Sequence, residues 1–417
     1  MFRPSNSETQ RSPPPWYHRI GPGLITACVV IGPGSILTSS KVGAQHGYAM
    51  NWVVVVAVFF MMVYTTLAAK LGVVADRSPG DLISHRLGRW LSVLIGTGVF
   101  FISAAFQFGN NLGVHAATSV YFQFDYTIVV FNALTIGFLF LFKDLYRAVE
   151  RLMMALVGLM LISFALNLAL AQPSLSKLVQ GFIPRSADTL DLSLLGLVGT
   201  TFVITAAYYQ AYLVRQKGWG GETELSSGLL TARIGSLIMA LITLMIVSTS
   251  AAVLQGQQLN SVSEVASQLK PLFGMWGQTL FCLGLFSAAY SSFLVNSMIG
   301  GFILADSLGL DSEPKDLAPR LLTTTVLLTG MGVALYAIRS DHSPVAAIVA
   351  AQAVTVVAAP LMAGALLWLT NRKDVMGENC NTFWTNIWAG LGLLLLLAMA
   401  YYTAAEKVWP AVREAFG

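Results

Sequence analysis

Long apolar runs separated by short polar loops fill nearly the whole chain. A helix needs roughly 20 apolar residues to cross a hydrocarbon core about 30 Å thick, and runs of that length recur from one end of the sequence to the other. The pattern predicts an all-α polytopic membrane protein with about eleven transmembrane helices. The expected spans are 21–48, 51–73, 91–122, 126–142, 149–171, 192–215, 229–254, 273–304, 318–338, 343–370 and 383–403.

Two of the expected spans contain helix breakers in matching places. The first has Gly32-Pro33-Gly34-Ser35 at its middle, where Pro33 lacks an amide donor and the glycines loosen the helix. The sixth has Gly196 and Gly199, followed by hydroxyl and β-branched residues up to Thr205. Membrane helices also tolerate Gly and Pro without any function. Because the two spans are five apart, however, the pairing favours two inverted repeats, helices 1–5 and 6–10, packed around a shared site.

The two repeats and the distribution of basic residues predict how the chain is divided and how it is oriented in the membrane. Lys and Arg concentrate in alternate loops, so the positive-inside rule places the N-terminus in the cytoplasm of a bacterial-type inner or plasma membrane. An odd number of spans then leaves the C-terminus outside. No short apolar leader with a cleavage site precedes the first span, so we expect no removable signal peptide. The expected parts are a cytoplasmic tail 1–19, a first repeat 20–172, a second repeat 173–372, and helix 11 with a C-terminal tail, 373–417.

Composition excludes several classes of protein. Of the 417 residues, 55% are hydrophobic and 11% charged, so water cannot be the main solvent. The net charge of +4 comes from basic residues spread over short loops, which is unlike a nucleic-acid surface. The three cysteines lie far apart, so they suggest neither a disulfide framework nor a zinc site. No span pairs a nucleophile with a base, and we expect neither an enzyme nor a cofactor.

Several short stretches, in the right order, resemble one transporter family. They include Gly21–Ile25 (GPGLI), Ala44–Tyr48 (AQHGY), Glu150–Leu152 (ERL) and Leu168–Pro173 (LALAQP), together with the spacing of Gln352 and Pro360. The sequence is similar here to the Nramp family of proton-coupled divalent metal transporters, over about residues 18–400. The resemblance implies the LeuT-type fold, a five-plus-five inverted repeat with helices 1 and 6 broken.

The chain departs from that family where the family binds its metal. The family's first break reads Asp-Pro-Gly-Asn, whereas this chain has Gly32–Ser35. The sixth-helix break reads roughly Ala-x-x-Met-Pro-His in the family and Thr200–Thr205 here. An acidic pair on the family's third helix is replaced by Gln107 and Asn110. The resemblance therefore implies a divergent member without the family's metal ligands.

The chemistry left at the two breaks suits a negative or dipolar ligand. No Asp or Glu occurs in 21–75 or 192–221, and an unneutralised dication at mid-membrane carries a high desolvation cost, so we expect no metal site. Half-helix N-termini offer free amide groups and a partial positive charge. Membrane Ser and Thr often bond their own helix instead. The expected substrate-binding residues are Gly32, Pro33, Gly34, Ser35, Thr38, Thr200, Thr201, Val203, Thr205, Ala206 and Gln352.

Four further residues are candidates for a pathway or for coupling. Gln107 and Asn110 stand where the family has its proton route. His115 is a candidate because histidine is the side chain best suited to exchange protons at physiological pH, but a lone buried histidine is more often structural. Lys41, near the outer end of the first span, either draws anions inward or extends to the interface.

Three hypotheses of function follow from the sequence. The first is a carrier of a small anion by alternating access, with bicarbonate as the specific expectation and a short carboxylate or an amino acid as variants. The second is a transporter of largely hydrated Mg²⁺ or Mn²⁺, using Gln352, Ser35 and backbone carbonyls. The third is a non-transporting sensor with the same fold. In each case the partners are a small ion or polar solute and the lipid bilayer, and the coupling ion, Na⁺ or H⁺, stays open.

Overall fold

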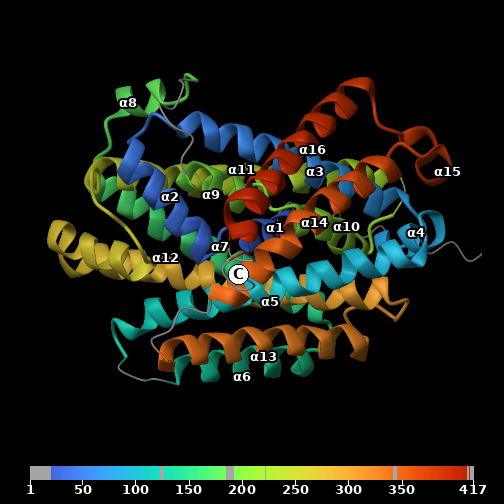
Figure 1. The fold of residues 1–417 in the computed structure, drawn as a ribbon, viewed down its shortest axis with the longest axis horizontal. Helices are drawn as coiled ribbons and strands as arrows, with labels where there is room; N and C mark the ends of the chain where they lie inside the picture. Colours follow the sequence, from blue (N-terminus) through green and yellow to red (C-terminus); the bar gives the residue numbers. More distant parts are fainter. Residues whose placement is uncertain are drawn as a thin grey trace, which may run out of the picture.

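The computed structural model describes residues 20–122, 126–184, 192–220, 222–340, 345–410 and 413, and within these ranges it contains helices and no strand. The expected N-terminal tail, 1–19, lies outside the described residues. Figure 1 shows the helices as one bundle. They are α1 (Gly21–Val30), α2 (Pro33–His46), α3 (Asn51–Val74), α4 (Pro79–Arg86), α5 (Arg89–Ser119), α6 (Thr127–Leu141), α7 (Leu145–Ala171), α8 (Leu175–Gln180), α9 (Leu192–Thr201), α10 (Ile204–Gln216), α11 (Glu222–Val253), α12 (Val262–Ser307), α13 (Leu317–Ser340), α14 (Val345–Leu369), α15 (Lys373–Met376) and α16 (Phe383–Thr403).

The predicted all-α polytopic fold is confirmed. In the described part of the chain, eight helices are long and apolar enough to cross a membrane, and α1 with α2 forms a ninth, bent span. Each expected span corresponds to one helix or one broken pair, within a few residues at most ends. The short helices α4, α8 and α15 were not predicted. The division into two repeats stays a prediction.

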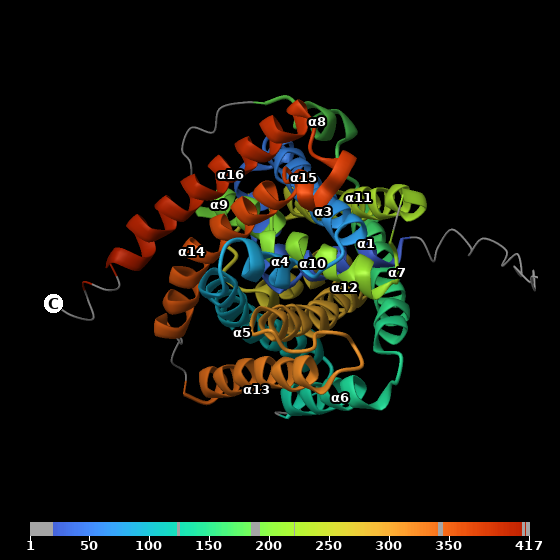
Figure 2. The same cartoon turned by 90° about the vertical axis from the view of Figure 1, so that its right-hand side faces the viewer.

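The helix α12 forms the buried centre of the bundle. In the apolar 18-residue stretch within Gly274–Ser307, 94% of the residues are buried, whereas 17% are buried in the corresponding stretch of α16. It packs against α5, α13, α7 and α1. Figure 2 shows α12 and α5 in the middle, with α6 and α13 together along one edge. A helix buried on all sides in this way can present polar groups to several neighbours at once.

Both predicted helix breaks are present. The axes of α1 and α2 differ by 64°, because Gly32 adopts an extended conformation (φ −109°, ψ −178°) and Pro33, the first residue of α2, has no amide hydrogen to continue the helix. In the sixth span, Phe202 and Val203 separate α9 from α10, and Val203 is likewise extended. The fold therefore interrupts two helices inside the bundle.

A close contact between α5 and the first break depends on a glycine. A Cβ added at Gly113 would lie 2.1 Å from Cγ of Pro33 and 3.1 Å from Cβ of Ala289. One turn earlier on the same helix, a Cβ at Gly109 would meet no atom within 4 Å. Gly113 thus lets α5 approach the rigid proline ring, which fixes α5 beside the break.

We expect Gly113→Ala to destabilise the protein by about 1–3 kcal/mol, because the added methyl overlaps a proline ring that cannot rotate away. The measurement is thermal unfolding of the purified protein in detergent. Gly109→Ala is the matched control. It should stabilise the protein by up to about 1 kcal/mol, because alanine has a higher helix propensity than glycine. Equal effects of the two substitutions would contradict the contact.

Candidate functional site at the paired helix breaks

The carbonyl groups at the end of α1 are bound by α12. The hydroxyl of Ser292 lies 2.9 Å from the carbonyl oxygen of Cys28 and 2.8 Å from that of Val29, and Ser291 Oγ lies 3.4 Å from the Cys28 oxygen. A helix that ends inside a membrane leaves carbonyls without partners, which hydrocarbon cannot supply. Neither serine was predicted from the sequence. One sign of them was available in the sequence. Ser287 and Ser291 are four residues apart, so they lie on one face of a helix in a span without acidic residues.

The start of α2 faces open space. Gly34 is exposed, and a Cβ added to it would meet nothing within 4 Å. The neighbouring Ser35 is 3% exposed, and no hydrogen bond joins its hydroxyl to another described residue. Pro33 is buried, and Gly32 accepts a bond from the Ile36 amide at 3.0 Å. This end of the helix therefore combines free amide groups, an available hydroxyl and access, as a binding site requires.

A pair of threonines joins α2 and α9. Thr38 Oγ1 on α2 lies 2.9 Å from Thr200 Oγ1 on α9. Each hydroxyl is also within bonding distance of its own helix, Thr38 with the Gly34 carbonyl at 3.0 Å and Thr200 with the Gly196 carbonyl at 2.8 Å. The structure thus brings these two predicted residues together. Their hydroxyls bond each other and the backbone of their own helices, as membrane threonines often do without any role in binding.

The second break is more enclosed than the first. Thr201 is fully buried and its hydroxyl has no partner among the described residues. Thr205 and Ala206, in the first turn of α10, are also buried, and the Val203 carbonyl accepts from the Ala206 amide at 3.1 Å. Phe202, which was not predicted, packs its ring 5.5 Å from that of Tyr64. The helix α10 contacts α1 and α12, the two helices that meet at the first break.

One carboxamide of α5, that of Asn110, lies at the first break, and it bonds a second one, that of Gln107. Asn110 Nδ2 donates to Gln107 Oε1 at 3.2 Å. Asn110 Oδ1 lies 3.4 Å from where a Cβ on Gly32 would be. Gln107 is fully buried, and its Nε2 has no partner among the described residues. The structure therefore places Asn110 next to the interrupted helix, and Gln107 behind it.

Two other predicted residues, His115 and Lys41, are not brought to the breaks, and the side chain of a third, Gln352, is not described. His115 Nδ1 lies 3.3 Å from Thr127 Oγ1, a contact between α5 and α6. Lys41 is half-buried on α2 and forms no hydrogen bond or ion pair with another described residue. Gln352 belongs to α14, but its side chain lies outside the described part.

No carboxylate contributes to the described site. Among the described residues no group of three or more His, Cys, Asp or Glu could hold a metal ion. The two buried carboxylates have other partners: Glu150 binds Lys217, and Asp306 binds Ser78, Tyr212 and the Gly80 amide. Negative potential at the breaks therefore comes from the carbonyl ends of α1 and α9.

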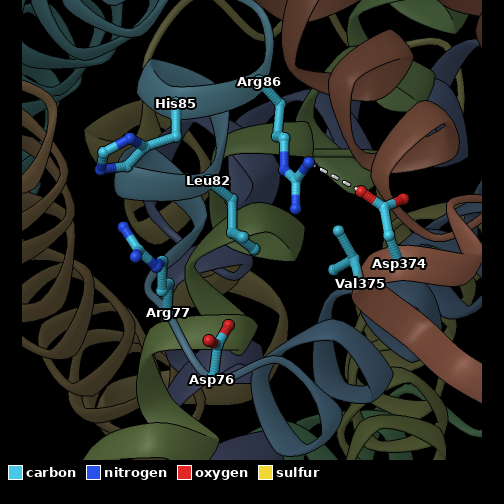
Figure 3. A pocket seen from close by; sticks show the side chains of 7 residues that line it. All are labelled: Asp76, Arg77, Leu82, His85, Arg86, Asp374 and Val375. Atoms are coloured by element: carbon cyan, nitrogen blue, oxygen red, sulfur yellow. Dashed lines mark ion pairs between the residues drawn. The ribbon is translucent and has the colours of Figure 1, made fainter.

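Two cavities lie away from the breaks and include none of the predicted substrate residues. One, of about 350 Å³, is lined by Asp76, Arg77, Leu82, His85, Arg86, Asp374 and Val375 (Figure 3). There Arg86 and Asp374 form an ion pair at 2.8 Å. Hydrogen bonding from Arg372, with the nearby Arg86 charge, lowers the pKa of Asp374. The other, of about 490 Å³, lies between the end of α2, α8 and the end of α11, and its lining includes His46, Lys177 and Gln255.

Comparison with known proteins agrees with this architecture. The family model described as "Natural resistance-associated macrophage protein-like" (Nramp) matches residues 23–406. The chain is 25% identical over 371 residues to "Divalent metal cation transporter MntH" of Deinococcus radiodurans, covering 86% of this chain and 83% of that protein. It is 28% identical over 381 residues to the protein of the same name from Chromohalobacter salexigens, covering 88% and 86%.

Solved structures show the same fold. A manganese transporter of Eremococcus coleocola superposes with a TM-score of 0.81 at 18% identity, covering 94% of this chain and 87% of that one. A Na⁺-coupled sialic acid symporter superposes with a TM-score of 0.57 at 12% identity, covering 92% and 89%. The shared architecture is LeuT-like, and the chain is an integral membrane protein that belongs to the Nramp family of transporters.

Proposed function

We propose that this chain is a secondary transporter that carries a divalent cation, Mn²⁺ or Mg²⁺ with much of its water shell, past the paired helix breaks by alternating access. Support comes from the relatives, which are named as divalent metal cation transporters and which this chain matches over 83% and 86% of their length. They do not support the expectation of a bicarbonate carrier, so the second hypothesis of the sequence analysis becomes the leading one.

The observation that carries the proposal is the convergence of neutral oxygens at the first break. The Cys28 and Val29 carbonyls, Ser35 Oγ and Asn110 Oδ1 all belong to this region. Mg²⁺ dehydrates reluctantly and usually keeps several waters. Oxygens that bind those waters, rather than the bare ion, reduce the desolvation cost that a site without carboxylates otherwise imposes. The carbonyl ends of α1 and α9 add partial negative charge.

A second candidate function, transport of a small anion such as bicarbonate, rests on a different observation. The exposed Gly34 presents the amide end of α2 to open space, and no carboxylate repels an anion among the described residues of the site. A helix N-terminus with free amides favours negative charge. The third candidate, a sensor that binds without transporting, differs from both by giving no flux.

Alternating access is supported by the close packing around α1, which closes the side of the protein where that helix begins. All of α1 except Val29 is buried. Glu150 lies against Gly21 at the start of α1, is 3% exposed, and pairs with Lys217 just after α10 at 2.5 Å. One carboxylate therefore ties α1, α7 and the end of α10 together. With the N-terminus in the cytoplasm, as the charge pattern predicts, this is the closed cytoplasmic side.

The proposal predicts uptake of Mn²⁺ or Mg²⁺ into proteoliposomes that contain the purified protein, and no uptake of labelled bicarbonate. The assay compares the three ions side by side, with empty liposomes as the control. Bicarbonate uptake without divalent uptake would establish the second candidate instead, and binding without any flux would establish the third.

Replacing Ser35 by Asp should increase divalent uptake several-fold, because a carboxylate at the open end of α2 neutralises part of the ion's charge. Ser35→Asn is the matched control, because asparagine has nearly the size of aspartate but no charge, and it should not reproduce the gain. Loss of transport in Ser35→Asp with retention in Ser35→Asn is the pattern expected of an anion carrier.

Lys217→Met should loosen the closed side, since it leaves the Glu150 carboxylate buried without its partner. The native reporter is Cys28 on α1, which is fully buried. In a background with the other two cysteines changed to serine, we expect Cys28 to react with a maleimide several-fold faster than in the parent protein.

The control for this experiment is Lys315→Met. Lys315 pairs with Glu313 at the surface, where the two side chains are 72% and 68% exposed, so its removal costs little. An equal Cys28 reaction rate in the parent protein and in Lys217→Met would show that the buried pair does not hold the closed side.

A further inference from the structure

We propose that the cavity between the end of α2, α8 and the end of α11 binds the phosphate group of an anionic phospholipid. The cavity has a volume of about 490 Å³, and its polar lining includes His46, Gln172, Ser174, Lys177, Gln180 and Gln255. None of the residues at the paired helix breaks lines it. The proposal therefore does not depend on which substrate the protein carries.

The charge of this cavity suits an anion. Lys177 and His46 are basic, and no Asp or Glu is among the lining residues. Lys177 is exposed and forms no hydrogen bond or ion pair with another described residue. A lysine ammonium attracts phosphate as a point charge, and neutral amides and hydroxyls donate further hydrogen bonds. The cavity of Figure 3 differs, because its lining includes Asp76 and Asp374, and Asp374 already pairs with Arg86.

The helix α8 has a polar and an apolar face. The polar face lines the cavity with Ser174, Lys177 and Gln180. The helical turns continue past α8, since the Ile183 amide donates to the Gln180 carbonyl at 3.1 Å. The opposite face carries Leu175, Val179 and Ile183, whose side chains are 74%, 64% and 58% exposed. A basic polar face opposite an exposed apolar face is typical of a helix that lies in the membrane interface.

The preceding helix, α7, offers a surface for acyl chains. Ile162, Leu166 and Leu170 recur every four residues and are 60%, 46% and 44% exposed. At 1.5 Å per residue they extend over about 12 Å, against about 15 Å for the hydrocarbon of one leaflet. The row ends directly before Ala171 and Gln172, which line the cavity. A lipid whose phosphate occupies the cavity can therefore place a chain along α7.

The wall formed by α8 is fixed to the bundle. Both cartoon views place α8 at the edge of the bundle (Figures 1 and 2). The Trp52 amide donates to the Gly181 carbonyl at 3.0 Å, and Asn51 Nδ2 donates to the Leu178 carbonyl at 3.4 Å. A Cβ added to Gly181 would lie 2.0 Å from the Tyr48 carbonyl oxygen. With the N-terminus in the cytoplasm, as the charge pattern predicts, this wall belongs to the outer leaflet.

The location connects the lipid to the first helix break. The helix α2 begins at that break, and its last residue, His46, lines the cavity. The end of α2 is also tied to the segment after α11, because the Gly256 amide donates to the Ala44 carbonyl at 2.8 Å. A phosphate bound between α8 and this end favours conformations that keep α2 in place. Such a ligand shifts the conformational equilibrium by its difference in affinity, so lipid composition would regulate transport.

The test is thermal unfolding of the full-length protein in detergent with added phosphatidylglycerol, phosphatidylcholine of the same chains, or inorganic phosphate. We expect phosphatidylglycerol to raise Tm in a saturable manner, and the other two to have much smaller effects. Lys177→Gln should reduce this shift by half or more. Lys270→Gln is the matched control, because Lys270 is also exposed, near the start of α12, but does not line the cavity, and it should keep the shift.

A second measurement locates the lipid. Phosphatidylglycerol with a photoreactive group in its acyl chain should cross-link to residues 162–183 of the parent protein, as mapped by mass spectrometry of its peptides. The proposal is overturned if Lys177→Gln and Lys270→Gln show equal shifts, or if phosphatidylcholine matches phosphatidylglycerol. It is also overturned if inorganic phosphate reproduces the shift, since the cavity would then take a free anion, or if the cross-links lie only in other segments.

Discussion

The structure depends on the satisfaction of backbone groups where a helix stops inside the membrane. Hydrocarbon offers no hydrogen bonds, so the carbonyls left free at the end of α1 need partners from the protein. Ser292 supplies one hydroxyl for two of them, the carbonyls of Cys28 and Val29. Because Ser292 belongs to the buried part of α12, the break is fixed against the centre of the bundle, and the open end of α2 is positioned by the same contact.

The remaining contacts around the break divide it into a fixed side and an accessible side. Gly113 brings α5 against Pro33, and Glu150 covers the start of α1. At the other end, Gly34 faces open space, while the paired threonines hold α2 to α9. A site that is rigid toward one side and open toward the other is what alternating access requires in one of its two states.

Much of the fold could be read from the sequence, and less of the site. Apolar runs of membrane length and the proline at position 33 have local physical consequences, so the spans and both breaks were predicted. Ser292 lies more than 260 residues from the carbonyls that it binds, and no local pattern reports such a contact. The structure brings Thr38 and Thr200 together, but the sequence could not show that each hydroxyl also lies within bonding distance of its own helix. The lack of acidic residues favoured an anion by simple electrostatics, an argument that omits the waters a divalent ion retains.

The most direct test of the central claim, that the paired breaks form one ion site, is anomalous X-ray scattering from crystals of the protein grown with Mn²⁺. We expect an anomalous peak between Gly32–Ser35 at the start of α2 and Phe202–Thr205 at the start of α10. A peak elsewhere, for instance in the cavity beside Asp76 and Asp374, or no peak at Mn²⁺ concentrations that support transport, would contradict it.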